Sequence, residues 1–409
     1  MKTSDAPEAL IVGAGPVGMM TALALADQGV KPVLIDSAAD SAQRSFACGL
    51  HPRSLELLEG FDLLDEILEW GYRVEKLAFY DAENRRAEID FSEVRSRHPF
   101  MIVLPQSALV WMMERTLHEW AGIDILRGHR LAELRQDERG VYAKLQRAGS
   151  AGAASGPKLE SGAGQESILL ETRALVGADG RQSTVRQKLG IPYEFFGYRE
   201  HFAVFEFETD APLDREMRVI LDGGRVNVLW PISERRCRWN LQIDPSTAEA
   251  WSTANSNGVG DIAASFAALL RARAPWFGGG IKDVTWLTHT VFEKRLANRF
   301  SQGRCWLAGD AAHQTGPVGA QSLNVGLAEA VEVAHKIVQV IQGNESEHDE
   351  AEWNHRNRAR WLGLLGADPN TRVHYPSDWL NQEFERIHSC LPASPEVFPF
   401  LLAQLRATV

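Results

Sequence analysis

Hydrophobic and small residues open the chain in a pattern of strand, helix and strand. Residues 10–12 and 32–35 are short apolar runs, and the segment between them, 18–28, is rich in the small residues of a closely packed helix. The second run ends on Asp36. Short apolar runs that alternate with a helical segment are typical of parallel strands buried on both faces. We therefore predict that the chain begins with a βαβ unit.

Helices and strands continue beyond this unit. Apolar residues with helical spacing predict helices at 54–69 and 107–121. Strand-like runs at 142–146 and 168–170 enclose a stretch in which 14 of the 20 residues from 148 to 167 are Gly, Ala or Ser. Because such a composition buries little apolar surface, we predict a flexible hairpin loop there.

The middle of the chain has a different period. Apolar and polar residues alternate in 201–208, 226–230 and 238–243. This alternation predicts an antiparallel sheet with one buried face, in a layer distinct from the opening unit. A polar stretch at 246–260 is expected to lead into a helix that ends near Arg273.

The last part of the chain returns to strand and helix. We predict a buried strand at 304–308 and a helix at 324–342, and residues 344–409 have helical patterning. No repeat with a fixed period is visible.

Composition and charge narrow the class of protein. Hydrophobic residues make up 44% and charged residues 24% of the 409, which is typical of a folded globular chain rather than a disordered one. The formal net charge of −11 disfavours binding to a nucleic acid backbone. The four cysteines lie far apart without a Cys-x-x-Cys pair, so we expect neither a disulfide framework nor a metal site. A cytoplasmic location fits these features best.

One uncharged stretch, 9–26, has the minimum length of a membrane span. Gly13, Gly15 and Gly18 interrupt it where a bilayer helix would need continuous hydrogen bonding. Residues 1–8 carry one lysine against two acidic residues, so the positive flank of a secretory signal is missing. We therefore expect no integral membrane span and no signal peptide.

The turn between the first strand and the helix is Gly13-Ala14-Gly15-Pro16-Val17-Gly18. The first glycine permits the turn, the second lets a pyrophosphate approach the backbone, and the third packs helix on sheet. The helix N-terminus supplies N–H groups for the phosphates, and Asp36 is placed for the ribose hydroxyls. The motif predicts a dinucleotide site but does not distinguish NAD from FAD. Its expected contacts are Gly13, Gly15, Pro16, Val17, Gly18 and Asp36.

Two further segments distinguish the cofactors. Residues 174–186 read ALVGADGRQSTVR and residues 305–313 read CWLAGDAAH. Together with the glycine motif, and in this order, they resemble the three fingerprints of the flavoprotein aromatic hydroxylases, the single-component FAD-dependent monooxygenases typified by para-hydroxybenzoate hydroxylase. Segments 49–58, 104–106 and 229–232 also match. The resemblance covers roughly residues 8–340.

This resemblance implies a mixed α/β fold with a Rossmann-like FAD-binding domain and an antiparallel-sheet substrate domain, as in para-hydroxybenzoate hydroxylase. The FAD-binding domain is expected to be discontinuous. The implied division is 1–75, 100–190 and 280–343 for the FAD-binding domain, 76–99 and 191–279 for the substrate sheet, and 344–409 for a C-terminal helical segment.

The resemblance also implies contacts to non-covalently bound FAD. Asp310 matches a position that binds ribityl or ribose hydroxyls, although an acid at the end of a strand also serves as a helix N-cap. Asp179 matches the second fingerprint, although Asp-Gly is also an ordinary turn. The further contacts implied are Arg44, Gln106, Leu131, Asp179, Gly309, Asp310, Pro317, Gly319, Ala320, Leu323 and Asn324.

Residues 317–324 resemble the loop that holds the reactive ring of the flavin. The loop precedes a helix, so its N–H groups are expected to face negative charge on the reduced flavin. The family pattern is Pro-x-Gly-Gly-x-Gly-x-Asn, and this chain has Ala320 and Ser322 at two of the glycines. A side chain at a position with positive φ costs on the order of 1 kcal/mol.

The implied reaction is the hydroxylation of a phenolic, heteroaromatic or polyketide-like small molecule. NADPH or NADH would dock transiently and reduce the flavin, and O2 would then form a flavin C4a-hydroperoxide that transfers the hydroxyl group. The alternatives are a halogenase or a reductase on the same scaffold, or a ligand-binding flavoprotein without turnover. The chain is expected to be a monomer or a homodimer.

Candidates for catalysis are Pro317 and His51. A His near a phenol is a plausible base, and the alternative for His51 is a structural role. Candidates for substrate contact are Cys48, Trp230 and Trp239. Because side chains alternate along a strand, about half of the substrate sheet's residues are expected to face the ligand.

Overall fold

The computed structural model describes residues 7–41, 49–148, 167–254, 259–343, 347–365, 375, 377–392, 394 and 397–407. A six-stranded sheet carries the glycine motif, in the order β18, β19, β12, β1, β2, β8, and every neighbouring pair is parallel except β18 and β19. The strands are Ser301–Gln302 (β18), Cys305–Leu307 (β19), Ala174–Gly177 (β12), Ala9–Val12 (β1), Pro32–Asp36 (β2) and Ile125–Arg127 (β8). The predicted βαβ opening is confirmed.

Three long helices cover this sheet. They are α1 (Pro16–Asp27), α4 (Gln106–Ala121) and α8 (Gln321–Ile341), and α1 packs against both of the others. Residues 18–25 of α1 are all buried, which explains why the sequence shows small residues here instead of a polar stripe. A Cβ on Gly309 or on Gly326 would lie 2.9 Å from the side chain of Val17. Glycine at these two positions therefore lets the three segments meet closely.

Smaller elements surround this layer. A three-stranded sheet contains β9 (His129–Gln136), β10 (Val141–Arg147) and β11 (Ser167–Thr172), and a second contains β3 (Gly49–Leu50), β7 (Met101–Val103) and β4 (Tyr72–Val74). The short helices here are α2 (Pro52–Glu59), α3 (Leu64–Trp70) and α5 (Thr184–Lys188), with 3-10 turns at Phe91–Glu93 and Gly309–Ala311. Strands β10 and β11 pair antiparallel, as the sequence predicts, and residues 149–166 of the expected loop lie outside the described residues.

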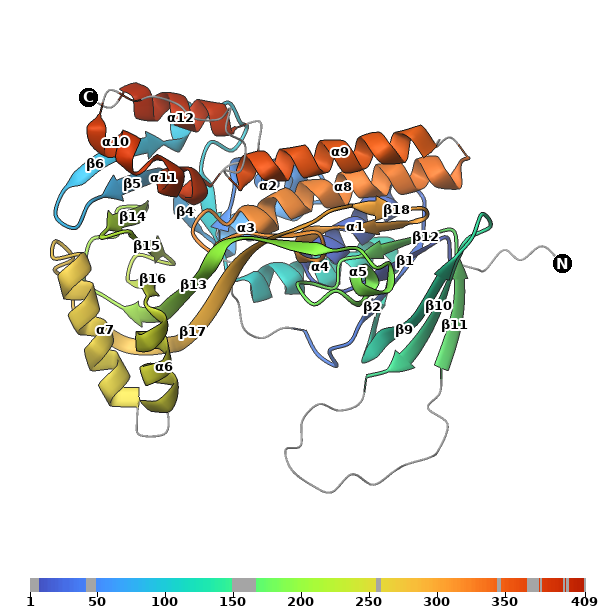
Figure 1. Ribbon diagram of the computed structural model, residues 1–409, viewed down its shortest axis with the longest axis horizontal. Helices are drawn as coiled ribbons and strands as arrows, with labels where there is room; N and C mark the ends of the chain where they lie inside the picture. Colours follow the sequence, from blue (N-terminus) through green and yellow to red (C-terminus); the bar gives the residue numbers. More distant parts are fainter. Residues whose placement is uncertain are drawn as a thin grey trace, which may run out of the picture.

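An eight-stranded sheet forms the second large layer, in the order β20, β17, β13, β16, β15, β14, β5, β6. Its strands are His313–Gln314 (β20), Lys282–Ala297 (β17), Tyr193–Glu208 (β13), Arg236–Ile243 (β16), Arg225–Pro231 (β15), Glu216–Asp222 (β14), Lys76–Tyr80 (β5) and Arg85–Asp90 (β6). The long strands β13 and β17 run from the side of α8 to the opposite end of the molecule (Figure 1). They link the two layers.

Both faces of the eight-stranded sheet are covered. On one face, Phe205 stacks on Phe266 of α7 (Val259–Arg273), with ring centroids 3.6 Å apart, and α6 (Pro245–Ala254) packs beside it. On the other face, Trp230 belongs to a core cluster completed by the C-terminal helices. Figure 1 shows α7 and the C-terminal helices on opposite sides of β14–β16. The sheet therefore has two buried faces rather than one.

The C-terminal helices are α9 (Glu347–Leu364), α10 (Asp378–Gln382), α11 (Phe384–Cys390) and α12 (Phe398–Ala407). Helix α9 runs along α8 (Figure 1), where Trp361 donates from Nε1 to the buried Glu329 carboxylate at 2.5 Å. The other three helices lie over β5 and β6. The predicted helical character of this segment is confirmed.

Three further differences between the sequence-based predictions and the structure concern single elements. The helix expected at 54–69 is two helices, because Asp62 has a φ of 58° in the turn between α2 and α3. The polar stretch expected at 246–260 contains α6, and Ala248 of this helix joins the core cluster on that face of the sheet. Strand β17 was not predicted, because it carries no regular alternation and its residues are mostly half-buried.

No helix in the described ranges is both long and apolar enough to cross a membrane.

Candidate active site

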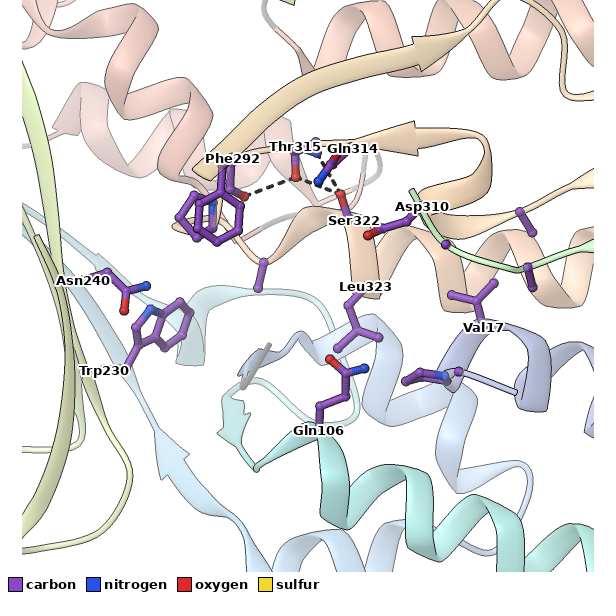
Figure 2. Close-up of a pocket in the computed structure, with 18 of the residues that line it drawn as sticks. Val17, Gln106, Trp230, Asn240, Phe292, Asp310, Gln314, Thr315, Ser322 and Leu323 are labelled. Atoms are coloured by element: carbon purple, nitrogen blue, oxygen red, sulfur yellow. Dashed lines mark hydrogen bonds between the residues drawn. The ribbon is translucent and has the colours of Figure 1, made fainter. Parts of the chain in front are cut away.

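A cavity of about 270 Å³ lies between the six-stranded and eight-stranded sheets. Residues from at least six segments line it. Figure 2 shows Val17 at one end, Trp230 and Asn240 at the other, and Gln106 and Leu323 between them. The lining residues are Gly15, Pro16, Val17, Gln106, Ala178, Gly180, Trp230, Arg238, Asn240, Phe292, Ala308, Asp310, Gln314, Thr315, Gly316, Pro317, Ala320, Ser322 and Leu323. The three fingerprints and the substrate sheet therefore meet in one space.

The three motif glycines have different surroundings. A Cβ on Gly13 would lie 2.3 Å from the carbonyl oxygen of Ala178, and one on Gly18 would lie 1.9 Å from that of Gly13. A Cβ on Gly15 would meet no protein atom within 4 Å. Gly13 and Gly18 are therefore required by packing, whereas Gly15 leaves space open on the cavity side, as close approach by a pyrophosphate requires.

The N-termini of two helices lie at this cavity. Helices α1 and α8 both begin without a side-chain hydrogen bond at the N-cap, and the lining includes residues at the start of each. Such N-termini attract negative charge. One of them is adjacent to Gly15 and the other to Ala320, so a molecule with two anionic regions could engage both.

Asp36 fixes the turn after β1. Its Oδ2 accepts from the amide of Ala14 at 2.7 Å and its Oδ1 accepts from that of Ala38 at 2.8 Å. The carboxylate thus connects the end of β2 to the glycine turn. Each oxygen keeps further acceptor capacity for a ribose hydroxyl, which is the contact that the sequence predicts for this residue.

The second fingerprint forms a tight turn. Asp179 accepts from Ser183 Oγ at 2.5 Å and from the amide of Thr184 at 2.6 Å, so it caps α5. Its neighbours Ala178 and Gly180 line the cavity, and Asp179 does not. Asp179 therefore has a local structural role, and the cofactor contact predicted for it stays a prediction, as it does for Asp36, which also lies outside the lining. Arg186 anchors the same turn by donating to the carbonyl of Ala311 at 2.8 Å.

Asp310 differs from Asp179 because its carboxylate is open to the cavity. The backbone carbonyl of Asp310 accepts a hydrogen bond from the hydroxyl of Tyr193 at 3.0 Å. Within the described residues, its carboxylate accepts none. Burial among protein atoms raises the pKa of this carboxyl, and the charges of His313 and Arg181 oppose the shift. An open acceptor in this environment fits the ribityl or ribose hydroxyls predicted for it.

The loop that precedes α8 contains the expected backbone strain. Ala320 has a φ of 49° and a ψ of 28°, a left-handed conformation that costs alanine about 1–2 kcal/mol. Two side chains donate hydrogen bonds to the backbone carbonyls that flank the strained dihedral angles of Ala320. Asn324 Nδ2 donates to the Ala320 carbonyl at 2.7 Å, and His51 Nε2 donates to the Gly319 carbonyl at 2.9 Å. These hydrogen bonds offset the strain.

Ser322 explains the second departure from the family pattern. Its Oγ accepts from the amide of Thr315 at 3.0 Å and lies 3.0 Å from Thr315 Oγ1 (Figure 2). The serine therefore closes the base of the loop with hydrogen bonds that glycine could not make. The substitutions at 320 and 322 produce a loop that is strained at one residue and tied at its ends.

His51 does not line the cavity, although it was a candidate base. It is 1% exposed, and burial lowers its pKa to about 3. Its amide donates to Asn324 Oδ1 at 2.8 Å while its ring holds Gly319. The catalytic assignment to His51 is therefore corrected to the structural alternative, a neutral residue that positions the flavin loop. Pro317 does line the cavity.

The buried state of His51 predicts a dependence of stability on pH. The unfolded chain binds a proton at His51 below pH about 6.5, and the folded chain does so only near pH 3. The unfolded state therefore binds more protons as pH falls, and the free energy of unfolding decreases. Between pH 7 and pH 5 this residue alone should remove about 2 kcal/mol.

Urea denaturation of His51→Gln at pH 7 and at pH 5 checks this expectation, since glutamine can still donate to the loop. The loss on acidification should be smaller than in the unmodified protein by about 2 kcal/mol. A remaining loss is expected from His388, whose pKa burial lowers to about 4. An equal loss in both proteins would contradict the assignment.

The eight-stranded sheet supplies the other end of the cavity. Arg238 and Asn240 of β16 face it together with Trp230 of β15 and Phe292 of β17. Trp239 lies between the two β16 residues and points to the opposite face, where its ring is 5.4 Å from Phe277. The substrate contact predicted for Trp239 is therefore wrong, because strand alternation turns it away.

Trp230 is held by the segment around His51. A Cβ on Gly49 would lie 3.0 Å from the Trp230 ring, and Asn324 Nδ2 donates to the Gly49 carbonyl at 2.8 Å. The indole thus packs directly on backbone that is bonded to the start of α8. The substrate end and the flavin loop share this support.

The structure brings together only some of the predicted site residues. Those in the cavity lining are Gly15, Pro16, Val17, Gln106, Asp310, Pro317, Ala320, Leu323 and Trp230. Those outside the lining are Gly13, Gly18, Asp36, Leu131, Asp179, Gly309, Gly319, Asn324, His51 and Trp239. Leu131 is a buried core residue of β9. Arg44 and Cys48 lie outside the described residues.

Ten lining residues were not among the predicted contacts. Six of them lie in segments that the sequence analysis singled out, namely Ala178, Gly180, Arg238, Asn240, Ala308 and Ser322. Of the other four, Phe292 lies on the unpredicted strand β17. Gln314, Thr315 and Gly316 follow the third fingerprint directly, and their position beside it is the signal that could have found them.

A family described as an FAD binding domain matches residues 7–362. The chain belongs to this family. The residues of the cavity fit the cofactor, because Gly15 leaves a cradle that a Cβ would fill, two helix N-termini face it, and Asp310 presents an open acceptor. The FAD predicted from the three fingerprints is thus supported by the family and by the site.

Curated relatives of the chain include three monooxygenases. Rifampicin monooxygenase of Rhodococcus hoagii is 29% identical over 82% of this chain and 64% of its own length. Pentachlorophenol 4-monooxygenase of Sphingobium chlorophenolicum is 28% identical over 82% and 58%, and 12-dehydrotetracycline 5-monooxygenase/anhydrotetracycline 6-monooxygenase of Streptomyces rimosus is 30% identical over 82% and 63%. The predicted membership of the flavoprotein aromatic hydroxylases is confirmed. The chain spans less than two thirds of the length of each of these relatives.

Solved structures show the same fold. The p-nitrophenol 4-monooxygenase of Pseudomonas putida is similar with a TM-score of 0.74 at 20% identity, over 98% of both chains. Aklavinone-11 hydroxylase, solved with FAD and aklavinone, is similar with a TM-score of 0.65 at 23% identity, over 84% of this chain and 64% of that one. These likenesses confirm the predicted fold class.

Proposed function

We propose that this protein is an FAD-dependent monooxygenase that uses NADPH or NADH and O2 to hydroxylate a phenolic, heteroaromatic or polyketide-like substrate. One observation carries the proposal. A single cavity joins Gly15 and Asp310, which fit FAD, to Trp230 and Phe292, which fit a planar ring. The names of the relatives support the same reaction class.

FAD, when bound, supplies hydride acceptance and oxygen activation, which protein side chains do not provide. The chain's own residues bind the cofactor, orient the substrate and shield both from water. The N-termini of α1 and α8 offer N–H groups to negative charge. The aromatic walls at Trp230 and Phe292 stack against a ring and keep water from the substrate end.

The described lining contains neither histidine nor tyrosine. Its only ionisable side chains are those of Asp310 and Arg238, and Asp310 lies at the cofactor end. We therefore assign no general base from His or Tyr at the substrate end. The protein's contribution there is orientation of the substrate and exclusion of water.

The proposed activity is tested on purified protein with its flavin content measured. Phenolic substrates should raise NAD(P)H consumption, and product formed under ¹⁸O2 should carry one labelled oxygen atom. If none of a panel of phenols, heteroaromatics and aromatic polyketides raises consumption with labelled product, the hydroxylase assignment is wrong. Bound FAD in that case would favour a ligand-binding flavoprotein.

The docking of the reductant is also a proposal. A second cavity of about 550 Å³ adjoins the first at Gln314. Four guanidinium groups and one carboxylate line it, which suits the phosphates of a nicotinamide dinucleotide. The charged lining residues are Arg181, Arg186, Arg199, Arg295 and Glu293, and His201, Tyr193, Gln182, Gln187 and Val291 complete it.

Replacing Arg199 by glutamate should raise the KM for NADPH by about tenfold or more, because like charges across a binding surface repel. FAD content should stay at the unmodified level, since Arg199 lines only the second cavity. Lys282→Glu is the matched control, as Lys282 is an exposed cation in the same sheet and lines neither cavity. An unchanged KM in Arg199→Glu would place the reductant elsewhere.

A further inference from the structure

The substrate end of the cavity contains a buried polar atom without a partner. Asn240 is 5% exposed, and its Oδ1 has no hydrogen-bond partner among the described residues. Figure 2 shows the amide beside the Trp230 ring, at the edge of the cavity that both residues line. A buried amide oxygen left unsatisfied costs about 1–3 kcal/mol, so a ligand that donates to it would be stabilised.

The walls on either side of this amide are aromatic. Trp230 lies on the strand next to Asn240, since Arg238 pairs with Trp230 and Asn240 pairs with Val228 in the ladder between β15 and β16. Phe292 faces the same space from β17 and is held edge-on by Phe202, with centroids 5.7 Å apart. A planar ring placed here would lie between the two aromatic side chains, at the side of the cavity that Asn240 lines.

The cationic side chain in the described lining of this cavity, Arg238, is already paired with a carboxylate. Arg238 is 3% exposed, and its guanidinium pairs with Glu206 through Nε at 2.6 Å and through Nη2. The same group lies 4.8 Å from the centre of the Trp286 ring. With Asp310 added, the charged groups around the cavity are one guanidinium and two carboxylates. A carboxylate on the substrate would therefore be buried without a free counter-charge.

We infer that Asn240 determines specificity for an uncharged aromatic ring that carries an O–H or N–H donor, and that the Arg238–Glu206 pair disfavours aromatic carboxylates. This inference rests on the proposed function, because it concerns the substrate of the same cavity. Asn240 Oδ1 accepts the donor of the substrate, and the Trp230 and Phe292 rings fix the plane of its ring.

The test measures binding rather than turnover. FAD-loaded protein is titrated calorimetrically at pH 7, without reductant, with 2-naphthol, with its methyl ether 2-methoxynaphthalene, and with 2-naphthoate. The unmodified protein should bind 2-naphthol about five- to tenfold more tightly than the ether, as one hydrogen bond to a buried acceptor provides. It should bind 2-naphthoate most weakly.

Asn240→Leu keeps the side-chain volume and removes the acceptor. It should bind 2-naphthol and the ether with affinities within about twofold of each other. Gln242→Leu, two residues along the same strand and outside the cavity lining, is the matched control and should keep the preference. FAD content is measured in every variant.

Three results would overturn the inference. They are tighter binding of 2-naphthoate than of 2-naphthol by the unmodified protein, no binding of 2-naphthol at all, or an unchanged preference in Asn240→Leu. The first two need no variant to fold. If the protein hydroxylates aromatic substrates but shows any of these results, only the inference about Asn240 is wrong. If it prefers 2-naphthol as expected but transfers no oxygen, only the proposed function is wrong.

Discussion

Replacement of Gly15 by valine is expected to give a folded protein that no longer retains FAD. Gly15 has a φ of −77° and a ψ of 177°, which is extended backbone that valine adopts readily, and a Cβ there meets no protein atom within 4 Å. The added side chain would project into open space beside the glycine turn, where we expect the pyrophosphate. Loss of the close backbone contacts should raise the Kd for FAD about 100-fold or more.

Flavin absorbance per chain and circular dichroism of the apoprotein measure the two parts of this expectation. Gly278→Val is the matched control, because a Cβ at that exposed position also meets nothing within 4 Å but lies away from the cavity. Gly18→Val should fail to fold, since its Cβ would lie 1.9 Å from the Gly13 carbonyl. Stoichiometric FAD in Gly15→Val would refute the placement of the cofactor.

Replacement of Asp310 by alanine is expected to weaken FAD binding about 10- to 100-fold, the effect of losing a charge-assisted hydrogen bond to the cofactor's hydroxyls. The apoprotein should keep its stability, because the carboxylate faces the cavity and makes no hydrogen bond to the described part of the chain. Equilibrium titration of apoprotein with FAD, followed by flavin fluorescence, gives the Kd.

The contrast with Asp179→Ala makes this result specific. Asp179 caps α5 through Ser183 and Thr184, so its loss should lower the free energy of unfolding by about 1–2 kcal/mol. FAD affinity should fall less in Asp179→Ala than in Asp310→Ala. The opposite order would mean that the second fingerprint, and not the third, holds the hydroxyls.

The first layer of the fold could be predicted from the sequence because its signals are local. Short apolar strands, a glycine turn and a following helix all lie within 30 residues, and β1, α1 and β2 appear where expected. The long strands β13 and β17 could not be delimited in this way. They pass between two environments, so their burial changes along their length and no single period describes them.

The cavity lining was predictable where a residue stands at a fixed point in a motif. Gly15 and Asp310 are examples. It was not predictable where the facing direction depends on strand register. Trp239 and Asn240 are adjacent on β16, yet only Asn240 reaches the cavity, and the sequence cannot show which of the two faces is covered by α7.

His51 illustrates a further limit. A histidine beside a predicted pocket suggests acid-base chemistry, but only packing shows that its ring is enclosed and bonded to the Gly319 carbonyl. The motif around it is explained by support of the flavin loop rather than by proton transfer.

The end of α11 reaches the same loop from the other side. Gln321 Nε2 donates to the Leu391 carbonyl at 3.1 Å, and a Cβ on Gly319 would lie 3.0 Å from that oxygen. A carbonyl 70 positions downstream of Gln321 thus lies against the loop that contains the strained Ala320. Detachment of the terminal helices, for example by limited proteolysis, would therefore change the absorbance or fluorescence of the flavin before the two large sheets unfold.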